Sequence, residues 1–369
     1  MGRQDIKVKT SSFTYKVLIG EGLLAETGEA VRRISPGDRL LLISDTTVYK
    51  IYGQQIQRAL EAGKWQVETA MIKPGERSKS LAGAARLYNQ AIEAGLDRHC
   101  PFVALGGGVV GDLAGFAAAT YLRGVPLVMV PTTLLAQVDS GVGGKVAVNH
   151  PAGKNLIGAI YPPRLVITDP GVLNTLPYRQ LAAGLAEVIK YGIIGDKTFF
   201  ACLERDLGRM LNKESLPLSN AVARSIAAKA EVVEKDEFEK DYRQVLNFGH
   251  TIGHALEAAT EYRHYLHGEA VAVGMVAATM LSRSLKMIEA GAAGRILRLL
   301  GRLGLKQPPP GLTGEAVTDK LRQDKKRRDG KTVFILPTAV GRVSILEVND
   351  NQLIGRVIEA CLRNEINLQ

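Results

Sequence analysis

Four of the six histidines, His250, His254, His264 and His267, lie within 18 consecutive positions of this 369-residue chain. His250 and His254 are four residues apart in a segment with helical periodicity, so their rings are expected on one helix face, one turn apart. Neutral imidazole is a common zinc ligand, and catalytic zinc sites combine three protein ligands with an open position. The spacing also suits histidines that pack in a core, so further ligands are needed to favour a metal site.

Acidic and basic residues accompany this cluster. Glu187 and Lys190 stand three residues apart in one expected helix, a spacing that most often gives a solvated ion pair. A second series leads into the histidine segment: Lys229, Glu239, Arg243 and Asn247. Together with two or three imidazoles, these side chains would form a metal site suited to an oxygen-rich anion.

A glycine-rich turn points to a nucleotide. The apolar run Phe102–Leu105 leads directly into Gly106–Asp112, which has the Gly-x-Gly-x-x-Gly spacing. Glycines there let the backbone approach a pyrophosphate, whose charge meets the amides of the next helix. The acid expected about 20 residues later to hold a ribose is absent, because that position is Pro131. Asp45, at the end of an earlier strand, is the better candidate and predicts an arrangement other than the standard Rossmann fold.

Short apolar runs alternate with helical segments through the first half of the chain. After two β-like runs within 6–19, strands are expected at 39–45, 66–72, 102–105, 127–130 and 165–168. This rhythm, with continuous apolar strands, predicts an open parallel sheet covered by helices. The polar, glycine-rich stretch 137–163 is expected to be a long functional loop, whose lysines and asparagines suit a phosphate or carboxylate.

The second half is dominated by helical periodicity. Helices are expected at 178–191, 199–211, 216–236, 244–260, 267–284 and 290–303, before a terminal piece of mixed structure. A chain of this length exceeds the size at which one core keeps growing. We therefore expect two domains: residues 1–176, an α/β nucleotide-binding domain, and residues 177–369, a mostly α-helical metal- and substrate-binding domain.

Composition excludes several classes of protein. The net charge of +10 is spread along the chain and aromatic residues make up only 5%, so an anionic small substrate explains the charge better than nucleic acid does. Three widely separated cysteines argue against a disulfide framework and indicate a reduced, cytoplasmic location. No run is long and apolar enough for a signal peptide or a membrane span.

Several motifs resemble those of the 3-dehydroquinate synthase family, and the likeness extends over nearly the whole chain. They are Gly106–Phe116, Val130–Asp139, Asn149–Asn155, Gly184–Lys190, Leu246–His250 and Leu266–Glu269. The resemblance implies NAD bound by the N-terminal domain, a divalent metal (zinc or cobalt) bound by the C-terminal domain, substrate between them and a homodimer. The reaction would convert 3-deoxy-D-arabino-heptulosonate 7-phosphate to 3-dehydroquinate and phosphate, in the shikimate pathway of aromatic amino acid biosynthesis.

The resemblance also implies a role for individual residues. The metal ligands would be Glu187, His250 and His267. His254 would then be a catalytic acid or base instead of a fourth ligand, with Glu239 and Lys145 also catalytic. The substrate would contact Arg123, Asp139, Lys145, Asn155, Lys190, Lys229, Arg243, Asn247 and one of Lys325 and Lys326. The nucleotide would contact Asp45, Glu76, Arg77, Ser78, Lys79, Gly107, Gly108, Val109, Gly111, Asp112, Thr132, Thr133, Lys154, Val172, Leu173, Asn174 and Thr175.

The implied chemistry is a transient oxidation by NAD, elimination of phosphate, return of the hydride and an internal aldol closure. NAD ends unchanged, so the enzyme would be a lyase. The alternatives are another sugar-phosphate cyclase, such as a 2-deoxy-scyllo-inosose or valiolone synthase, a metal- and NAD-dependent polyol dehydrogenase, and a module that only binds a nucleotide. The sequence Asn149-His150-Pro151, followed by Gly153-Lys154-Asn155, and the many cationic residues favour dehydroquinate synthesis.

Overall fold

A computed structural model describes residues 3–327 and 332–363, without the side chains of 324–327. The chain packs into two units, Met1–Leu176 with Ser215–Phe238, and Pro177–Glu214 with Glu239–Gln369. They differ from the expected segments 1–176 and 177–369 in the helix α8 (Ser215–Lys235), which packs against the first unit. Hydrogen bonds explain this, because the Lys9 amide donates to Glu234 at 3.1 Å and Ser215 donates to Glu21.

The first unit is built on a seven-stranded sheet with the order β1-β2-β9-β6-β5-β3-β4. All neighbouring strands are parallel except β1 and β2. The strands are β1 (Gln4–Lys9), β2 (Thr14–Ile19), β3 (Arg39–Asp45), β4 (Gln66–Ile72), β5 (Phe102–Gly106), β6 (Leu127–Pro131) and β9 (Leu165–Thr168). The expected parallel α/β sheet is thus confirmed.

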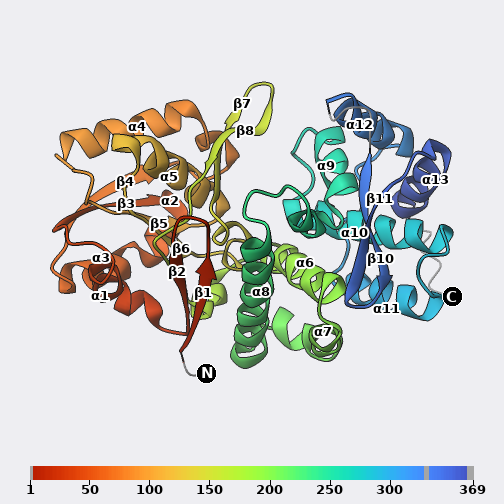
Figure 1. The fold of residues 1–369 in the computed structure, drawn as a ribbon, viewed down its shortest axis with the longest axis horizontal. Helices are drawn as coiled ribbons and strands as arrows, with labels where there is room; N and C mark the ends of the chain where they lie inside the picture. The colour runs from red at the N-terminus through yellow and green to blue at the C-terminus, as the bar shows by residue number, and fades with distance from the viewer. Residues whose placement is uncertain (1–2, 328–331, 364–369) are drawn as a thin grey trace. The chain divides into compact units, whose positions relative to one another are not determined.

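Helices cover both faces of this sheet (Figure 1). The helices α1 (Thr27–Arg32) and α3 (Gln54–Ala62) share one apolar cluster with Leu40 and Leu42 of β3. The opposite face carries α4 (Leu81–Glu93) and α5 (Gly108–Thr120). Because both faces are buried, the central strands are continuously apolar and do not alternate.

The chain reverses its direction of winding at β3. It passes from β3 to β4 on one side and then returns to place β5 on the other side of β3. At such a switch point the connections leave in opposite directions, which opens a crevice at the carboxyl ends of the two strands. Asp45 and Gly106 are the residues at these two ends.

The stretch 137–163 is not the loop expected from its glycines. It contains a π-helical turn, η5 (Ala136–Ser140), and an antiparallel hairpin of β7 (Lys145–His150) and β8 (Gly153–Ile160). Val146 and Val148 are buried, while Lys145, Ala147 and Asn149 are more exposed. This alternation is the period of a strand, and the surrounding glycines had concealed it.

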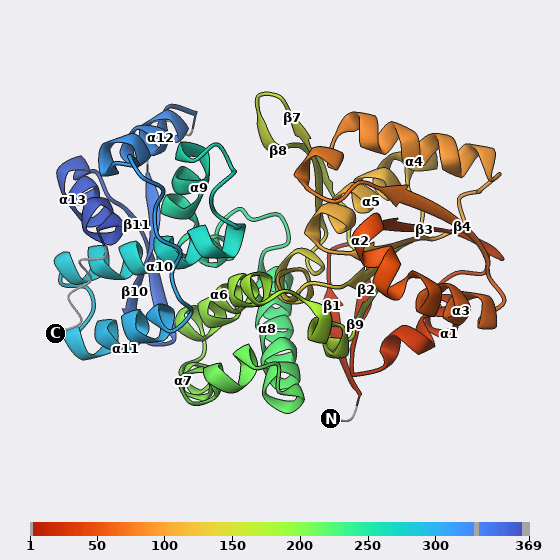
Figure 2. The same cartoon turned by 180° about the vertical axis from the view of Figure 1, so that it is seen from behind.

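The second unit is mostly helical, with α10 (His267–Ser284) packed against α6, α9, α11 and α13 (Figure 2). Its other elements are α6 (Tyr178–Ile194), α7 (Lys197–Leu211), η7 (Tyr242–Asn247), α9 (His250–Ala259), α11 (Ala290–Gly301), α12 (Gly314–Arg327), α13 (Asn351–Leu362) and a hairpin of β10 (Val333–Ala339) and β11 (Arg342–Glu347). The helix expected at 244–260 is therefore broken. Gly249 adopts a left-handed φ of 81°, which ends η7 and lets α9 begin at His250.

None of the helices in the described ranges combines the length and the hydrophobicity needed to span a bilayer. The three cysteines, Cys100, Cys202 and Cys361, are each free.

Candidate active site

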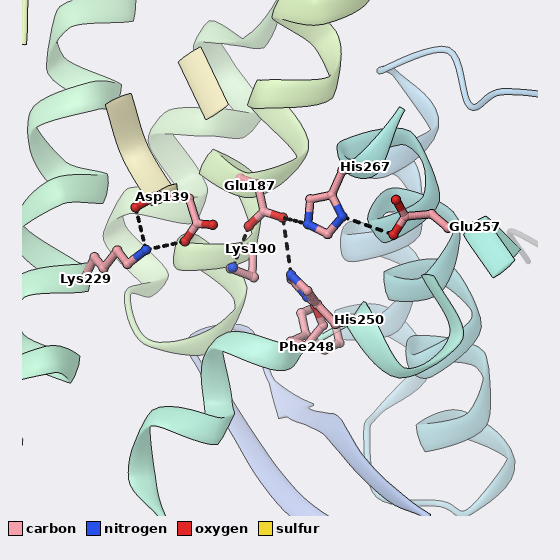
Figure 3. Close-up of polar contacts among 8 residues, drawn as sticks. All are labelled: Asp139, Glu187, Lys190, Lys229, Phe248, His250, Glu257 and His267. Atoms are coloured by element: carbon pink, nitrogen blue, oxygen red, sulfur yellow. Dashed lines mark hydrogen bonds and ion pairs between the residues drawn. The ribbon is translucent and has the colours of Figure 1, made fainter. Parts of the chain in front are cut away.

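Three side chains of the second unit converge from separate helices (Figure 3). Glu187 lies in the middle of α6, His250 is the first residue of α9, and His267 is the first residue of α10. The Oε1 atom of Glu187 is 3.7 Å from His250 Nε2 and 3.8 Å from His267 Nε2. One ligand atom from each of the three lies within 4.8 Å of the others, a separation that a single metal ion can bridge.

Both imidazole rings are oriented by a second contact. The Nδ1 atom of His250 lies 3.1 Å from the carbonyl oxygen of Phe248, and the Nδ1 atom of His267 lies 3.2 Å from Oε2 of Glu257. A carbonyl oxygen can only accept, so Nδ1 of His250 carries the proton and its Nε2 keeps a free lone pair. The lone pair is therefore directed toward Glu187, as a metal ligand requires.

Burial makes these groups unusual. Glu187 is fully buried, and neither of its carboxylate oxygens accepts a hydrogen bond of good geometry. Its ion-pair partner is Lys190, whose Nζ lies 2.5 Å from Oε2 and whose side chain is 1% exposed, so the pair is buried and not solvated. Burial, with the charge of Lys190, holds the pKa of His250 well below its usual value and keeps the ring neutral. The donor set, one carboxylate and two imidazoles, fits a divalent transition metal.

His254 lies beside this triad. Its ring centroid is 5.4 Å from that of His250 and 5.8 Å from that of His267, close to the 5.2 Å between those two rings, but its side chain is exposed. Among the described residues it joins a different group of potential ligands, with Glu257 and His267. The interpretation from spacing alone, in which His250 and His254 share an ion, ignored Glu187, which comes from 63 residues earlier in the chain.

Glycines allow the three helices to approach closely. A Cβ atom on Gly268 would lie 1.9 Å from the Ala183 carbonyl oxygen of α6, and one on Gly274 would lie 1.9 Å from the Gly249 carbonyl oxygen. The backbones of α6 and α10, and of α10 and the start of α9, are thus in direct contact near the triad. Sequence reasoning missed these positions, because a glycine inside a helical pattern carries no sign of which backbone lies opposite.

Other predicted residues of the second unit lie on η7 and just before it. The Asn247 amide donates to Oε1 of Glu239 at 2.9 Å. Glu239 adopts a left-handed φ of 57°, a strained conformation of the kind that persists at functional sites. Arg243 is 2% exposed. The side chains of Lys325 and Lys326 lie outside the described residues.

In the first unit, the predicted nucleotide residues follow the carboxyl ends of five parallel strands, which meet at one edge of the sheet. Asp45 ends β3, Glu76–Lys79 follow β4 at η3 (Glu76–Ser78), Gly107–Asp112 follow β5, Thr132 and Thr133 follow β6, and Val172–Thr175 lie in η6 (Pro170–Thr175) after β9. Only Lys154 lies elsewhere, on the β7–β8 hairpin.

Gly107 and Gly108 form the junction between β5 and α5. A Cβ on Gly107 would lie 3.1 Å from Thr133 Cγ2, and one on Gly108 would lie 3.1 Å from Ser140 Oγ, so both positions are tight for a larger residue. Gly107 is the N-cap residue of α5 and has no side chain to cap the helix. The first amides of α5 therefore receive no hydrogen bond acceptor from this residue, and a phosphate group at the sheet edge could accept from them.

Two contacts hold the sheet edge in shape. Oδ1 of Asp45 accepts from the amides of Thr47 and Val48, at 2.8 and 3.0 Å, which caps the short helix α2 (Thr46–Val48). The Tyr52 hydroxyl donates to the Val172 carbonyl oxygen at 2.8 Å and lies 2.6 Å from Thr175 Oγ1. Leu173 is buried and Asn174 is exposed.

Asn149 connects the two sets of predicted contacts in this unit. Its Nδ2 donates to Glu76, a predicted nucleotide residue, at 2.7 Å, and its Oδ1 accepts from the amide of Asn155, a predicted substrate residue, at 2.9 Å. Asn155 has a left-handed φ of 56°, which this hydrogen bond supports. Asn149 begins the family-like motif Asn149–Asn155, but its contacts with both sets of residues become evident only from the hairpin.

The remaining predicted substrate residues of the first unit lie on four elements, α8, η5, η4 and β7. Lys229 of α8 donates to the Asp139 carbonyl oxygen at 2.6 Å and to its Oδ1 at 2.5 Å (Figure 3). Arg123 ends η4 (Tyr121–Arg123), is exposed and has a left-handed φ of 63°. Lys145 is exposed at the start of β7.

Lys79 and Asp112 form a buried ion pair that gives a testable prediction. Lys79 Nζ lies 2.5 Å from Asp112 Oδ2 and also donates to Asn155 Oδ1, and the exposed side-chain fractions are 5% for Lys79 and 18% for Asp112. Burial raises the pKa of Asp112, and the Lys79 charge opposes this rise. Replacing Lys79 with Met should therefore lower the free energy of unfolding at pH 7.5 by about 3–5 kcal/mol.

The loss should depend on pH. Because the folded pKa of Asp112 lies above its unfolded value, its contribution to stability is complete below about pH 4 and is lost as the pH rises through the folded pKa. Lys79→Met raises that folded pKa further. The loss of unfolding free energy relative to wild type, measured by urea denaturation, should therefore be smaller at pH 4.5 than at pH 7.5. In the double variant Lys79→Met/Asp112→Asn, the loss of unfolding free energy should be the same at both pH values. An equal loss at both pH values in the single variant Lys79→Met would contradict the argument.

The chain is similar in sequence to known proteins over most of its length. Residues 69–183 match the family model described as 3-dehydroquinate synthase N-terminal, and residues 184–327 match that described as 3-dehydroquinate synthase C-terminal. A 3-dehydroquinate synthase from Pelotomaculum thermopropionicum is 50% identical over 343 residues, which cover 93% of this chain and 92% of the relative.

Two solved structures share the fold over 96% of this chain and 99% of their own chains. A 2-epi-5-epi-valiolone synthase from Streptomyces hygroscopicus, with NAD+ and Zn2+ bound, is 28% identical with a TM-score of 0.88. A 2-deoxy-scyllo-inosose synthase, complexed with carbaglucose-6-phosphate, NAD+ and Co2+, is 30% identical with a TM-score of 0.84. The relative is similar over 93% of the chain, the N-terminal and C-terminal family models together match residues 69–327, and the solved structures share the fold, so the chain belongs to the 3-dehydroquinate synthase family.

Proposed function

We propose that the protein is a 3-dehydroquinate synthase, a phosphate-eliminating lyase of the shikimate pathway. Its reaction converts 3-deoxy-D-arabino-heptulosonate 7-phosphate to 3-dehydroquinate and phosphate with no net change in NAD. The observation that carries the proposal is the buried Glu187 carboxylate facing the Nε2 atoms of His250 and His267, in a chain 50% identical to a protein of that name.

Glu187, His250 and His267 would hold a divalent metal, zinc or cobalt. When bound, such an ion polarises a hydroxyl group and eases the loss of its proton. Glu187 would supply the negative charge, and the two imidazole rings would supply nitrogen donors whose orientation is set by Phe248 and Glu257. The buried Lys190 beside Glu187 would meet the oxygen atoms of the substrate as they arrive.

The sheet edge of the first unit would hold NAD. The first amides of α5 would donate hydrogen bonds to the pyrophosphate, and Lys79 would add a cation next to it. Asp45 would contact the ribose, with Glu76, Arg77, Ser78, Gly107, Gly108, Val109, Gly111, Asp112, Thr132, Thr133, Lys154, Val172, Leu173, Asn174 and Thr175 as the surrounding contacts. NAD removes and later returns one hydride at the substrate.

Cationic and amide side chains, with one carboxylate, would bind the doubly anionic substrate. The cations and amides are Arg123, Lys145, Asn155, Lys190, Lys229, Arg243 and Asn247, with one of Lys325 and Lys326, and the carboxylate is that of Asp139. His254 is exposed next to the ring of His267 and would transfer protons during the reaction. Glu239, whose Oε1 accepts from Asn247, would act with it, and Lys145 would also take part in catalysis.

A phosphate-release assay tests the proposal. With heptulosonate phosphate and trace NAD, the purified protein should release phosphate without accumulating NADH. Removal of the metal by a chelator should abolish release, and added zinc or cobalt should restore it. Lasting NADH would support a polyol dehydrogenase, and release from glucose 6-phosphate alone would support a 2-deoxy-scyllo-inosose synthase.

We also infer a cytoplasmic location and a homodimer. Three free cysteines suit a reducing compartment. Size-exclusion chromatography with light scattering would test the dimer, and a monomer at micromolar concentration would contradict it.

A further inference from the structure

We propose that Glu257 is a positioning residue for the metal site. Its carboxylate would hold His267 in the one tautomer and ring orientation that direct Nε2 toward Glu187. The inference rests on the proposed function, because it concerns the same metal triad, and it assigns a role to a residue outside that triad.

The geometry places Glu257 behind His267 as seen from the metal side (Figure 3). His267 Nδ1 lies 3.2 Å from Glu257 Oε2, whereas its Nε2 lies 3.8 Å from Glu187 Oε1. The ring thus spans two carboxylates, one on each side. Glu257 belongs to α9, two turns after His250, so the helix that carries one ligand also carries the group that orients another.

The burial of Glu257 indicates that its carboxylate needs a hydrogen-bond partner. Glu257 is 4% exposed, and burying a carboxylate without compensation costs several kcal/mol. A hydrogen bond to the ionised form offsets that cost, and His267 Nδ1 can donate one. An ordinary apolar residue would fill the same helix face without this cost.

Proton positions follow from the contact. Ionised carboxylate oxygens only accept, so Nδ1 of His267 must carry the N–H. A ring that binds a metal has one N–H, so a proton held on Nδ1 leaves the lone pair on Nε2, the atom that faces Glu187. Phe248 does the same for His250 through a carbonyl oxygen, and an ionised carboxylate is the stronger acceptor and raises ligand basicity more.

A different role for Glu257 must be separated from this one. His254, Glu257 and His267 also form a group that could hold an ion. As a ligand, Glu257 would need Nδ1 of His267 without its proton, and the hydrogen bond at 3.2 Å would be absent. The positioning role therefore predicts a protonated Nδ1 in the metal-free protein, and the ligand role predicts no such preference.

The test uses the whole protein with Glu257→Ala, Glu257→Gln and a control, Glu261→Gln, whose side chain is 74% exposed nearby. Zinc affinity is measured by competition with a chelating dye. Glu257→Ala should weaken zinc binding by about 10–100-fold. The zinc affinity of Glu257→Gln should lie between those of wild type and Glu257→Ala, because its amide oxygen still accepts a hydrogen bond. Glu261→Gln should leave the affinity unchanged.

The tautomer is measured without metal. Nitrogen NMR of the metal-free protein distinguishes protonated from unprotonated ring nitrogens, and His267→Asn assigns the signal. Wild-type protein should show Nδ1 of His267 protonated, and Glu257→Ala should show a mixture. Unchanged zinc affinity in Glu257→Ala, or an unprotonated Nδ1 in wild type, would overturn the inference. So would equal losses in the Ala and Gln variants, which would make Glu257 a ligand. Failure of the wild-type protein to bind zinc or release phosphate would instead contradict the proposed function.

Discussion

Replacing Glu187 with Gln should lower phosphate release by about 1,000-fold or more and strip the protein of metal. The change removes the only negative charge among the three ligand side chains and keeps nearly the same shape. Charge stabilisation by a bound ion contributes several kcal/mol to such reactions, and each 1.36 kcal/mol is tenfold in rate. Metal content after dialysis, measured by mass spectrometry, should fall together with the rate.

A matched control and a stability measurement complete this test. Glu204→Gln breaks an ion pair with Arg295 at 2.6 Å on the surface of the same unit and should leave metal and rate unchanged. Glu187→Gln also leaves Lys190, 1% exposed, without its buried counter-charge, which should cost about 3–5 kcal/mol in the metal-free protein. Adding Lys190→Met should recover stability without recovering activity. A Glu187→Gln protein that kept its metal and its rate would refute the proposed site.

Replacing Gly268 with Ala should separate the metal ligands by steric pressure alone. The added Cβ would meet the Ala183 carbonyl oxygen at 1.9 Å, and this is backbone that cannot rotate away. Ala183 lies one turn before Glu187 on α6, and Gly268 follows His267 on α10, so any shift that relieves the clash moves a ligand. We expect the free energy of unfolding to fall by about 1–3 kcal/mol or more and zinc binding to weaken.

Gly291→Ala provides the matched control. Gly291 is likewise the second residue of its helix, α11, but a Cβ there would meet no atom within 4 Å. This variant should be more stable than wild type by about 0.4–1 kcal/mol, because Ala restricts the unfolded chain. Urea denaturation measures the free energy of unfolding of both variants, and competition with a chelating dye measures their zinc affinity. If the two substitutions had the same effect on zinc binding, close packing of α6 and α10 would not position the ligands.

Much of the fold could be predicted from local patterns. The strands 39–45 and 66–72 match β3 and β4 residue for residue. The buried strand β3 is continuously apolar, whereas β4 is an edge strand in which polar and apolar residues mix. The hairpin β7–β8 was missed since glycines interrupt its alternation, and the break before His250 was missed since one left-handed glycine leaves a helical pattern intact. The placement of α8 was missed because it depends on partners such as Glu21 that are distant in sequence.

The residue types of the metal site could be named from the sequence by resemblance, whereas spacing alone paired His250 with His254. Spacing describes neighbours on one helix. It carries no information on which helices pack together, and the approach of α6, α9 and α10 depends on glycines whose backbone neighbours lie far along the chain.

The sequence by itself determined the class of fold, the family and the residue types proposed as metal ligands, since these depend on local periodicity and on motifs read in order. Only the tertiary structure decided which nitrogen of His250 and His267 faces Glu187, that Glu187 and Lys190 form a buried pair instead of a solvated one, and that Glu257 and Asn149 support the predicted contacts. Those features are distances between segments that folding brings together, and burial changes the energy of a charge in a way that no local pattern records.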